Sequence, residues 1–147
     1  MVSVYLVSGP VPPKFAGKET SRVIEIRGDQ TLHQLHLAIF KAFDRHDAHG
    51  YEFQLGRRPH DPDGPNYSVH RSLDSDKDRA ASGDARKTTL DELGLKQDRV
   101  FGYWFDFGDD WYHQVNVEKT GKAIPTVAYP RETRRVGKSP PQYAQAD

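Results

Sequence analysis

The sequence contains no cysteine among its 147 residues. This absence excludes a disulfide scaffold, a thiolate metal centre and a cysteine nucleophile, and it is compatible with a reducing compartment. A chain of this length buries about two thirds of the surface that its unfolded form exposes, which is enough for a core without disulfides or a structural metal. The sequence therefore predicts a single domain over residues 1–147.

An excess of charge of either sign is also missing, because 21 Lys and Arg residues balance 21 Asp and Glu residues. Nucleic acid is therefore a permitted partner but not a favoured one, since affinity for it comes largely from the release of phosphate counterions by basic side chains. The apolar runs are only a few residues long, whereas a membrane span needs about 20. Residues 1–5 lack the basic and apolar regions of a signal peptide. We expect a cytoplasmic protein with no membrane partner.

The apolar pattern that is present predicts an α+β fold. Apolar, β-branched and aromatic residues favour strands at residues 2–7, 22–26 and 49–55, and Thr31 can cap a helix over residues 32–43. We expect a mixed or antiparallel sheet of about 4–5 strands with this one main helix packed on it.

Two polar segments complete the predicted organisation. Residues 57–87 are rich in charge, Gly and Pro and have hardly any large apolar side chain. That composition is typical of a long polar insertion, which we expect to be mobile. Residues 119–147 are basic and contain several prolines, and they are predicted to form a tail.

Aromatic residues alternate through residues 101–118, which is typical of a β-hairpin with one buried face. A three-residue loop at residues 108–110 pairs Phe105 with His113 and gathers the apolar side chains on one face. A two-residue loop pairs Phe105 with Gln114 instead, and we reject it because a shift by one residue turns every side chain to the wrong face. The aromatic side chains predicted on the buried face are Phe101, Tyr103, Phe105, Phe107 and Trp111.

Several short motifs along the chain resemble one known family. They are Thr31-Leu32 with Leu35-His36, His49-Gly50-Tyr51-Glu52-Phe53, Tyr103-Trp104-Phe105-Asp106-Phe107-Gly108-Asp109-Asp110-Trp111-Tyr112-His113, Val117-Glu118 and Pro140-Pro141. Their types and order resemble the plasmid pRiA4b ORF-3-like family over nearly the whole chain. The resemblance implies a small α+β domain found on plasmids, mobile elements and prokaryotic chromosomes. It implies no established activity, because the family is one of unknown function.

Three histidines fall on predicted inward faces: His36 in the apolar stripe of the helix, His49 on its strand and His113 in the hairpin. If the helix crosses the sheet, the three imidazoles can converge and bind zinc or another divalent metal, with Asp109 or Asp110 completing the site. The alternative is that each histidine is partly buried with its own hydrogen-bond partner, which burial demands in any case.

The hairpin carries two further candidate features. Asp106, Asp109, Asp110 and Glu118 give residues 101–118 a charge of −4. They are either hard oxygen ligands and a general acid, or simply the turn chemistry of the hairpin. Trp104 and Tyr112 lie on the opposite face from the core, where they form either an exposed aromatic surface for a ligand, base or partner, or a surface that a second layer of protein covers.

These features favour a non-catalytic binding or interaction module whose partner is an unknown protein or small molecule. Two alternatives stay open. One is a metal-dependent enzyme that uses the His/Asp pocket, and the other is a nucleic-acid-binding accessory protein that uses the basic tail and Trp104. The sequence contains no Gly-rich phosphate loop, Gly-x-Ser-x-Gly elbow or His-Glu-x-x-His motif, so it indicates no class of reaction.

Overall fold

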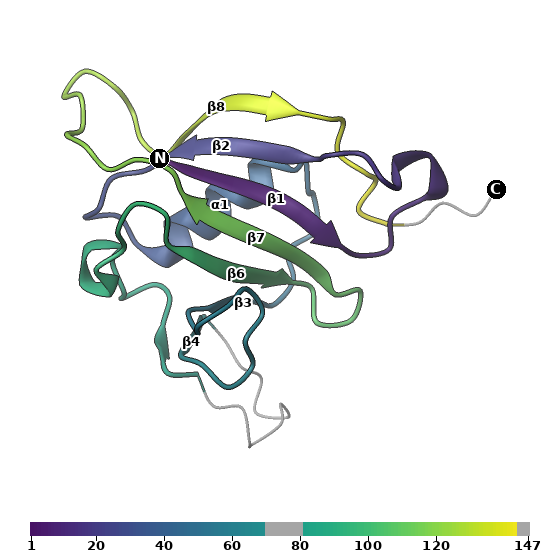
Figure 1. Cartoon of the computed structure of the whole chain (residues 1–147), viewed down its shortest axis with the longest axis horizontal. Coiled ribbons are helices and arrows are strands. Elements are labelled where there is room, and N and C mark those ends of the chain that lie inside the picture. Colours follow the sequence, from purple (N-terminus) through teal and green to yellow (C-terminus); the bar gives the residue numbers. More distant parts are fainter. Residues whose placement is uncertain (70–80, 144–147) are drawn as a thin grey trace.

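A computed structural model describes residues 1–69 and 81–143 of the chain. It contains one eight-stranded sheet in the order β5-β4-β3-β6-β7-β1-β2-β8, with one α-helix against one of its faces (Figure 1). All neighbouring strands are antiparallel except β4 and β5, which are parallel, so the sheet is mixed. The elements are β1 (Val2–Ser8), the 3-10 turn η1 (Pro13–Phe15), β2 (Ser21–Glu25), α1 (Leu32–Ala42), β3 (Tyr51–Gln54), β4 (Asn66–Ser68), β5 (Gly83–Asp84), the 3-10 turn η3 (Asp91–Leu93), β6 (Val100–Phe105), β7 (Trp111–Val117) and β8 (Arg131–Val136).

The prediction of about 4–5 strands is wrong, because the sheet has eight. The additional strands are β4 and β5, within residues 57–87, and β8, within residues 119–147. β8 is an edge strand of mostly charged, exposed residues without apolar alternation. Backbone pairing with β2 holds it in place, so it needs no apolar face. Residues 70–80 of the predicted mobile insertion lie outside the described residues.

The predicted helix is confirmed as α1, and its ends are fixed by local hydrogen bonds. Thr31 and Gln34 form a reciprocal capping box at the N-terminus. At the C-terminus the backbone N–H of Arg45 donates to the carbonyl of Phe40 and that of Asp44 donates to Lys41. These two bonds make a Schellman motif, with Asp44 in the left-handed conformation that glycine usually supplies. The side chains that α1 buries include Leu32, Leu35, His36, Ile39 and Ala42.

The strand pair β6–β7 buries alternate residues, as the sequence predicts, but with a longer turn. His113 pairs with Tyr103 and not with Phe105 as predicted, so the turn spans residues 106–110. The predicted register is therefore wrong by two residues. An even shift keeps every strand residue on its predicted face, whereas Phe107 moves into the turn and is 39% exposed instead of buried in the core.

The sheet has two different faces. The inner face packs against α1 and carries nearly all the large apolar side chains, including Val4, Phe53, Phe101, Phe105 and Val115. The face opposite α1 is called the outer face. Cross-strand pairing places two rows of residues side by side there. They are Glu52, Trp104, Tyr112 and Ser8 in one row, and Gln54, Gly102, Gln114 and Tyr5 in the next.

Arg22 of β2 is fully buried on the inner face beside the C-terminal end of α1. Its guanidinium donates five hydrogen bonds, to the carbonyls of Ser21, Ala42, Val136 and Gly137 and to the Ser139 hydroxyl. It also lies 5.0 Å from the centre of the Phe43 ring. One side chain therefore joins β2, α1, β8 and the segment that follows β8.

Within the described residues, no helix is long and apolar enough to span a membrane.

We expect Arg22→Met to lower the free energy of unfolding by about 3 kcal/mol, because several buried carbonyl oxygens lose their donor while the aliphatic stem still packs. Urea denaturation followed by circular dichroism measures this difference. Arg134 is exposed on neighbouring β8, so Arg134→Met is the matched control and should change the value by less than about 0.5 kcal/mol. Equal losses in the two variants would contradict the bridging role of Arg22.

Candidate functional site

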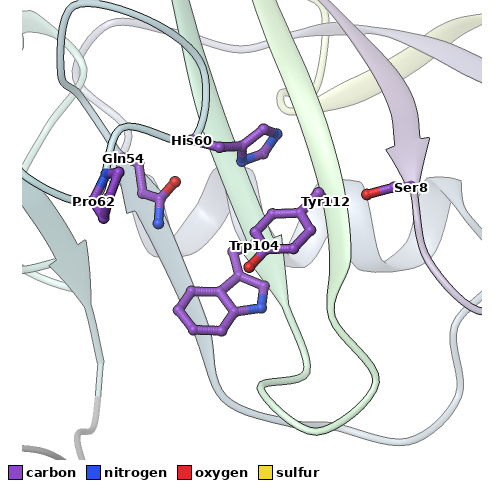
Figure 2. Close-up of a pocket in the computed structure, with 6 residues that line it drawn as sticks. All are labelled: Ser8, Gln54, His60, Pro62, Trp104 and Tyr112. Atoms are coloured by element: carbon purple, nitrogen blue, oxygen red, sulfur yellow. The ribbon is translucent and has the colours of Figure 1, made fainter.

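A pocket of about 240 Å³ opens on the outer face of the sheet (Figure 2). Ser8, Gln54, Trp104 and Tyr112 come from the ends or outer faces of β1, β3, β6 and β7. His60 and Pro62 come from the segment at residues 55–65, which links β3 to β4 and folds back over the sheet. Strands distant in the sequence and one connecting segment therefore form the pocket together.

Trp104 and Tyr112 form its flat wall. They face each other across β6 and β7, and their rings stack with centroids 5.6 Å apart and planes 17° apart. The Trp104 Nε1–H donates to Oδ1 of Asp110 at 2.9 Å, and the Phe107 ring packs 4.5 Å from the indole. The hydrogen bond and the turn residues therefore fix the orientation of the indole. Trp104 and Tyr112 therefore lie on the outer face, opposite the core, and both are half-buried.

His60 covers the sheet where β6 has no side chain. A Cβ atom at Gly102 would lie 2.6 Å from the backbone nitrogen of His60 and 2.9 Å from its Nδ1. The glycine therefore allows the segment at residues 55–65 to rest directly on the backbone of β6. The imidazole packs edge-on against Tyr112, with ring centroids 4.7 Å apart.

Polar atoms without partners lie around the pocket. Both ring nitrogens of His60 are buried and have no hydrogen-bond partner in the described structure, and burial lowers the pKa of this histidine. Its imidazole is therefore neutral at pH 7, with one donor and one acceptor. Gln54 donates from Nε2 to the buried carboxylate of Glu52 at 2.6 Å, which leaves Oε1 buried without a partner.

His36 of α1 and His113 of β7 are buried between the helix and the inner face, and both contact Tyr103. The Nδ1 atom of His36 lies 2.6 Å from the Tyr103 hydroxyl, and its ring stacks on Tyr51 at 3.7 Å. His113 lies with Nδ1 3.3 Å from the Tyr103 carbonyl and packs against Phe43. Burial is the main reason why both histidines have a pKa lowered to about 3. Both are therefore neutral core residues at pH 7.

His49 and the turn aspartates lie elsewhere. β3 begins at Tyr51, so His49 precedes the strand, and its side chain is 36% exposed. Its Nε2 lies 2.8 Å from the Tyr143 hydroxyl and 3.6 Å from Oδ2 of Asp106. Asp109 and Asp110 are exposed in the hairpin turn.

The structure does not bring His36, His49 and His113 into one site. In the part of the chain that the structure describes, no group of three or more His, Cys, Asp or Glu side chains is placed to hold a metal ion. Asp106 instead shapes the turn, because its Oδ1 accepts hydrogen bonds from the backbone of Gly108 and Asp109.

Comparison with known proteins agrees with this fold. The family model described as plasmid pRiA4b ORF-3-like protein matches residues 14–144. The chain belongs to this family. The pRiA4b ORF-3-like protein is also similar in structure to the protein of unknown function MM3350 from Methanosarcina mazei Go1, with a TM-score of 0.65 and 23% sequence identity over 91% of this chain and 67% of that one. This likeness shows the fold alone. A search of curated proteins found no match.

Sequence patterns did not identify Ser8, Gln54, His60 and Pro62 as site residues of this pRiA4b ORF-3-like protein. One signal was available, because a glycine inside an aromatic strand often marks the close approach of another backbone. Gly102 is such a glycine, between Phe101 and Tyr103. The pattern does not reveal which segment approaches it.

We expect Gly102→Ala to displace the segment at residues 55–65, because the new methyl group would overlap the backbone of His60. The free energy of unfolding should fall by about 1–3 kcal/mol. Amide hydrogen exchange should accelerate at residues 55–65 while β7 stays protected. Gly121 has no atom within 4 Å of the position a Cβ would occupy, so Gly121→Ala is the control and should leave exchange unchanged. Unaltered exchange at residues 55–65 in Gly102→Ala would contradict the close approach.

The buried histidines predict a loss of stability in acid. Their pKa values of about 3 lie below the 6.5 of an ordinary histidine, so between these pH values the unfolded chain binds more protons than the folded one. The neutral buried histidines therefore make their full contribution to stability above pH 6.5. As the pH falls towards 3, the free energy of unfolding decreases by up to about 1.4 kcal/mol per pH unit for each histidine. Urea unfolding between pH 4 and 7.5 measures the slope.

His36→Gln should reduce that slope by up to about 1.4 kcal/mol per pH unit, whatever its effect on stability at pH 7. The matched control is His46→Gln, which removes a histidine whose side chain is 64% exposed and should keep the wild-type slope. An unchanged slope in His36→Gln would show that this imidazole is not held neutral in the core.

Proposed function

We propose that this protein is a non-catalytic binding module and that its outer-face pocket binds a small, planar, uncharged molecule. The observation that carries the proposal is the flat Trp104–Tyr112 wall in the same pocket as the unpartnered polar atoms of Gln54 and His60. Ligand pockets typically combine an apolar or aromatic lining with a few polar groups that fix the orientation of the ligand.

The size of the pocket limits the ligand. About 240 Å³ is below the range of roughly 300–1,000 Å³ that is common for drug-sized molecules. A single ring or a compact fused ring system suits this space. The aromatic wall favours a flat ligand, because stacking on an indole or a phenol ring needs a planar partner.

The charges near the pocket favour a neutral ligand. The described residues that line it include no carboxylate, amine or guanidinium. Two carboxylates lie behind the lining, Glu52 bonded to Gln54 and Asp110 bonded to Trp104. Asp110 is exposed beside the indole and would repel a negatively charged ligand, so a phosphate-bearing ligand does not suit this surface.

The unpartnered polar atoms favour a ligand edge with both a donor and an acceptor. Oε1 of Gln54 accepts hydrogen bonds, and the neutral His60 imidazole has one nitrogen of each kind. A carboxamide or an amino-substituted heterocycle has such an edge. The alternative of a metal-dependent enzyme is less well supported, because its three histidines form no metal site within the described part of the chain, and the pocket residues seen there include no carboxylate that can act as a general base.

We expect nicotinamide, a planar ring with a carboxamide, to bind with a Kd on the order of 1–10 mM, as befits a molecule of this size. NMR of the indole Nε1–H groups measures binding, because the chain has two tryptophans and Trp104→Ala identifies the resonance of the first. Nicotinamide should shift the Trp104 resonance more than that of Trp111. The effect on the backbone amides of β6 and β7 should disappear in Trp104→Ala.

Three controls make this test specific. Cyclohexanecarboxamide has the same amide on a ring that is not flat, and benzoate is flat but anionic, so both should bind at least tenfold more weakly. Leu37 is 51% exposed on α1, away from the outer face, so Leu37→Ala should bind nicotinamide as the wild type does. Equal binding of the flat and the saturated amides, or no shift at 20 mM, would refute the proposal. A single-stranded DNA 10-mer that binds at low salt when nicotinamide does not would support nucleic-acid binding instead.

A further inference from the structure

A second polar site lies on the inner face, where Arg45 follows α1. The Schellman motif fixes its backbone, since its N–H bonds to the carbonyl of Phe40. Its side chain turns inward and the residue is only 7% exposed. The guanidinium lies 4.0 Å above the Trp111 ring and 6.0 Å from the centre of the Phe105 ring. Gly9 packs closely on the same indole.

The guanidinium is charged, and its terminal nitrogens have no partner among the residues that the structure describes. Burial lowers the pKa of Arg45 to about 10, so the group stays cationic at pH 7. Nη1 and Nη2 are both buried, and neither has a hydrogen-bond partner in the described structure. Nε1 of Trp111 and Nε2 of His113 also lie buried without partners on this face of β7.

The neighbouring carboxylates are already engaged. Asp106 uses Oδ1 to accept two backbone N–H groups of the hairpin turn, and its Oδ2 lies 3.6 Å from His49. Asp44 accepts from Arg135 and from Ser139 at 2.7 Å each through Oδ2. Both aspartates affect the pKa of Arg45 through space, but neither forms an ion pair with it.

Arg22 shows how unusual this lack of hydrogen-bond partners is for a buried arginine. Both arginines are buried and lie over an aromatic ring, Phe43 for Arg22 and Trp111 for Arg45. Arg22 donates five hydrogen bonds, whereas the two terminal nitrogens of Arg45 donate none within residues 1–69 and 81–143. Stacking on an indole only partly offsets the desolvation of a buried cation, so the guanidinium needs an acceptor.

We propose that Arg45 binds a small monocarboxylate of the size of formate, between the end of α1 and the β6–β7 hairpin. The paired N–H groups of a guanidinium match the two oxygens of a carboxylate, which gives short, charge-assisted hydrogen bonds. The Trp111 Nε1–H, in the same stack, is a further donor for the anion. This site is separate from the outer-face pocket and does not rest on the function proposed for that pocket.

Thermal and urea unfolding test the proposal by comparing sodium formate with sodium gluconate at the same sodium concentration. Gluconate is the reference anion because it is too bulky for a buried site. A ligand that binds only the folded state multiplies the ratio of folded to unfolded protein by 1 + [L]/Kd, so 100 mM formate raises this ratio about 100-fold if Kd is about 1 mM. Formamide is a neutral molecule of nearly the same shape, and 100 mM formamide should leave the ratio within twofold of its value in gluconate.

Arg45→Met keeps a long side chain over Trp111 but removes the charge, and it should abolish the effect of formate. Arg134→Met removes an exposed arginine and should retain the effect in full. If Arg45→Met does not fold, the wild-type protein still gives an answer, because formate should shift the Trp111 indole resonance with saturation and leave that of Trp104 unchanged. The proposal would be overturned if stability were identical in formate, gluconate and formamide, or if Arg45→Met kept the full formate effect. Either result would mean that water molecules are the hydrogen-bond partners of the Arg45 guanidinium.

Discussion

One short helix has to cover a much wider sheet, and the other features of the fold depend on this mismatch. α1 has 11 residues and is about 16 Å long, whereas the eight strands span about 34 Å across the sheet. α1 lies closest to β2 and β8, and the rings of His36 and Phe40 reach β3 and β6. Polar groups and connecting segments complete the packing of the sheet. Arg22 joins the backbones at the β2–β8 side, and the segment at residues 55–65 covers part of the outer face.

The same mismatch explains why the two buried arginines, Arg22 and Arg45, lie near the C-terminal end of the helix. A side chain beyond the last turn of α1 is enclosed by the sheet but has few backbone groups to bond, because the strands use their own in pairing. Arg22 reaches the carbonyl of Ala42, which the end of α1 leaves free, and that of Gly137, which follows β8. Arg45 enters over Trp111, where the β6–β7 ladder is complete, and meets only ring faces. Its position, rather than its residue type, leaves its terminal nitrogens unpaired.

Period-two burial was enough to predict which faces β6 and β7 present, and therefore that Trp104 and Tyr112 lie opposite the core. It did not fix the register, because the left-handed backbone at Asp106 and Asp110 makes a five-residue turn that a hydrophobic pattern does not encode. β8 escaped prediction because an edge strand is defined by its pairing and not by its apolar residues. The position of His60 was not predicted because it depends on a contact with the backbone of Gly102, which lies far away in the sequence.

The division between the faces also bears on where binding chemistry can be placed. The inner face supplies the apolar burial that stabilises the fold, so a change at Phe105 or Trp111 would open a cavity in the core. Trp104 and Tyr112 are half-buried and belong to no part of that core, so their side chains are constrained less by packing. The sheet still holds them rigidly in register across β6 and β7. A binding site needs a rigid backbone under side chains that can be exchanged, so we place the proposed binding on the outer face and not at the inward histidines.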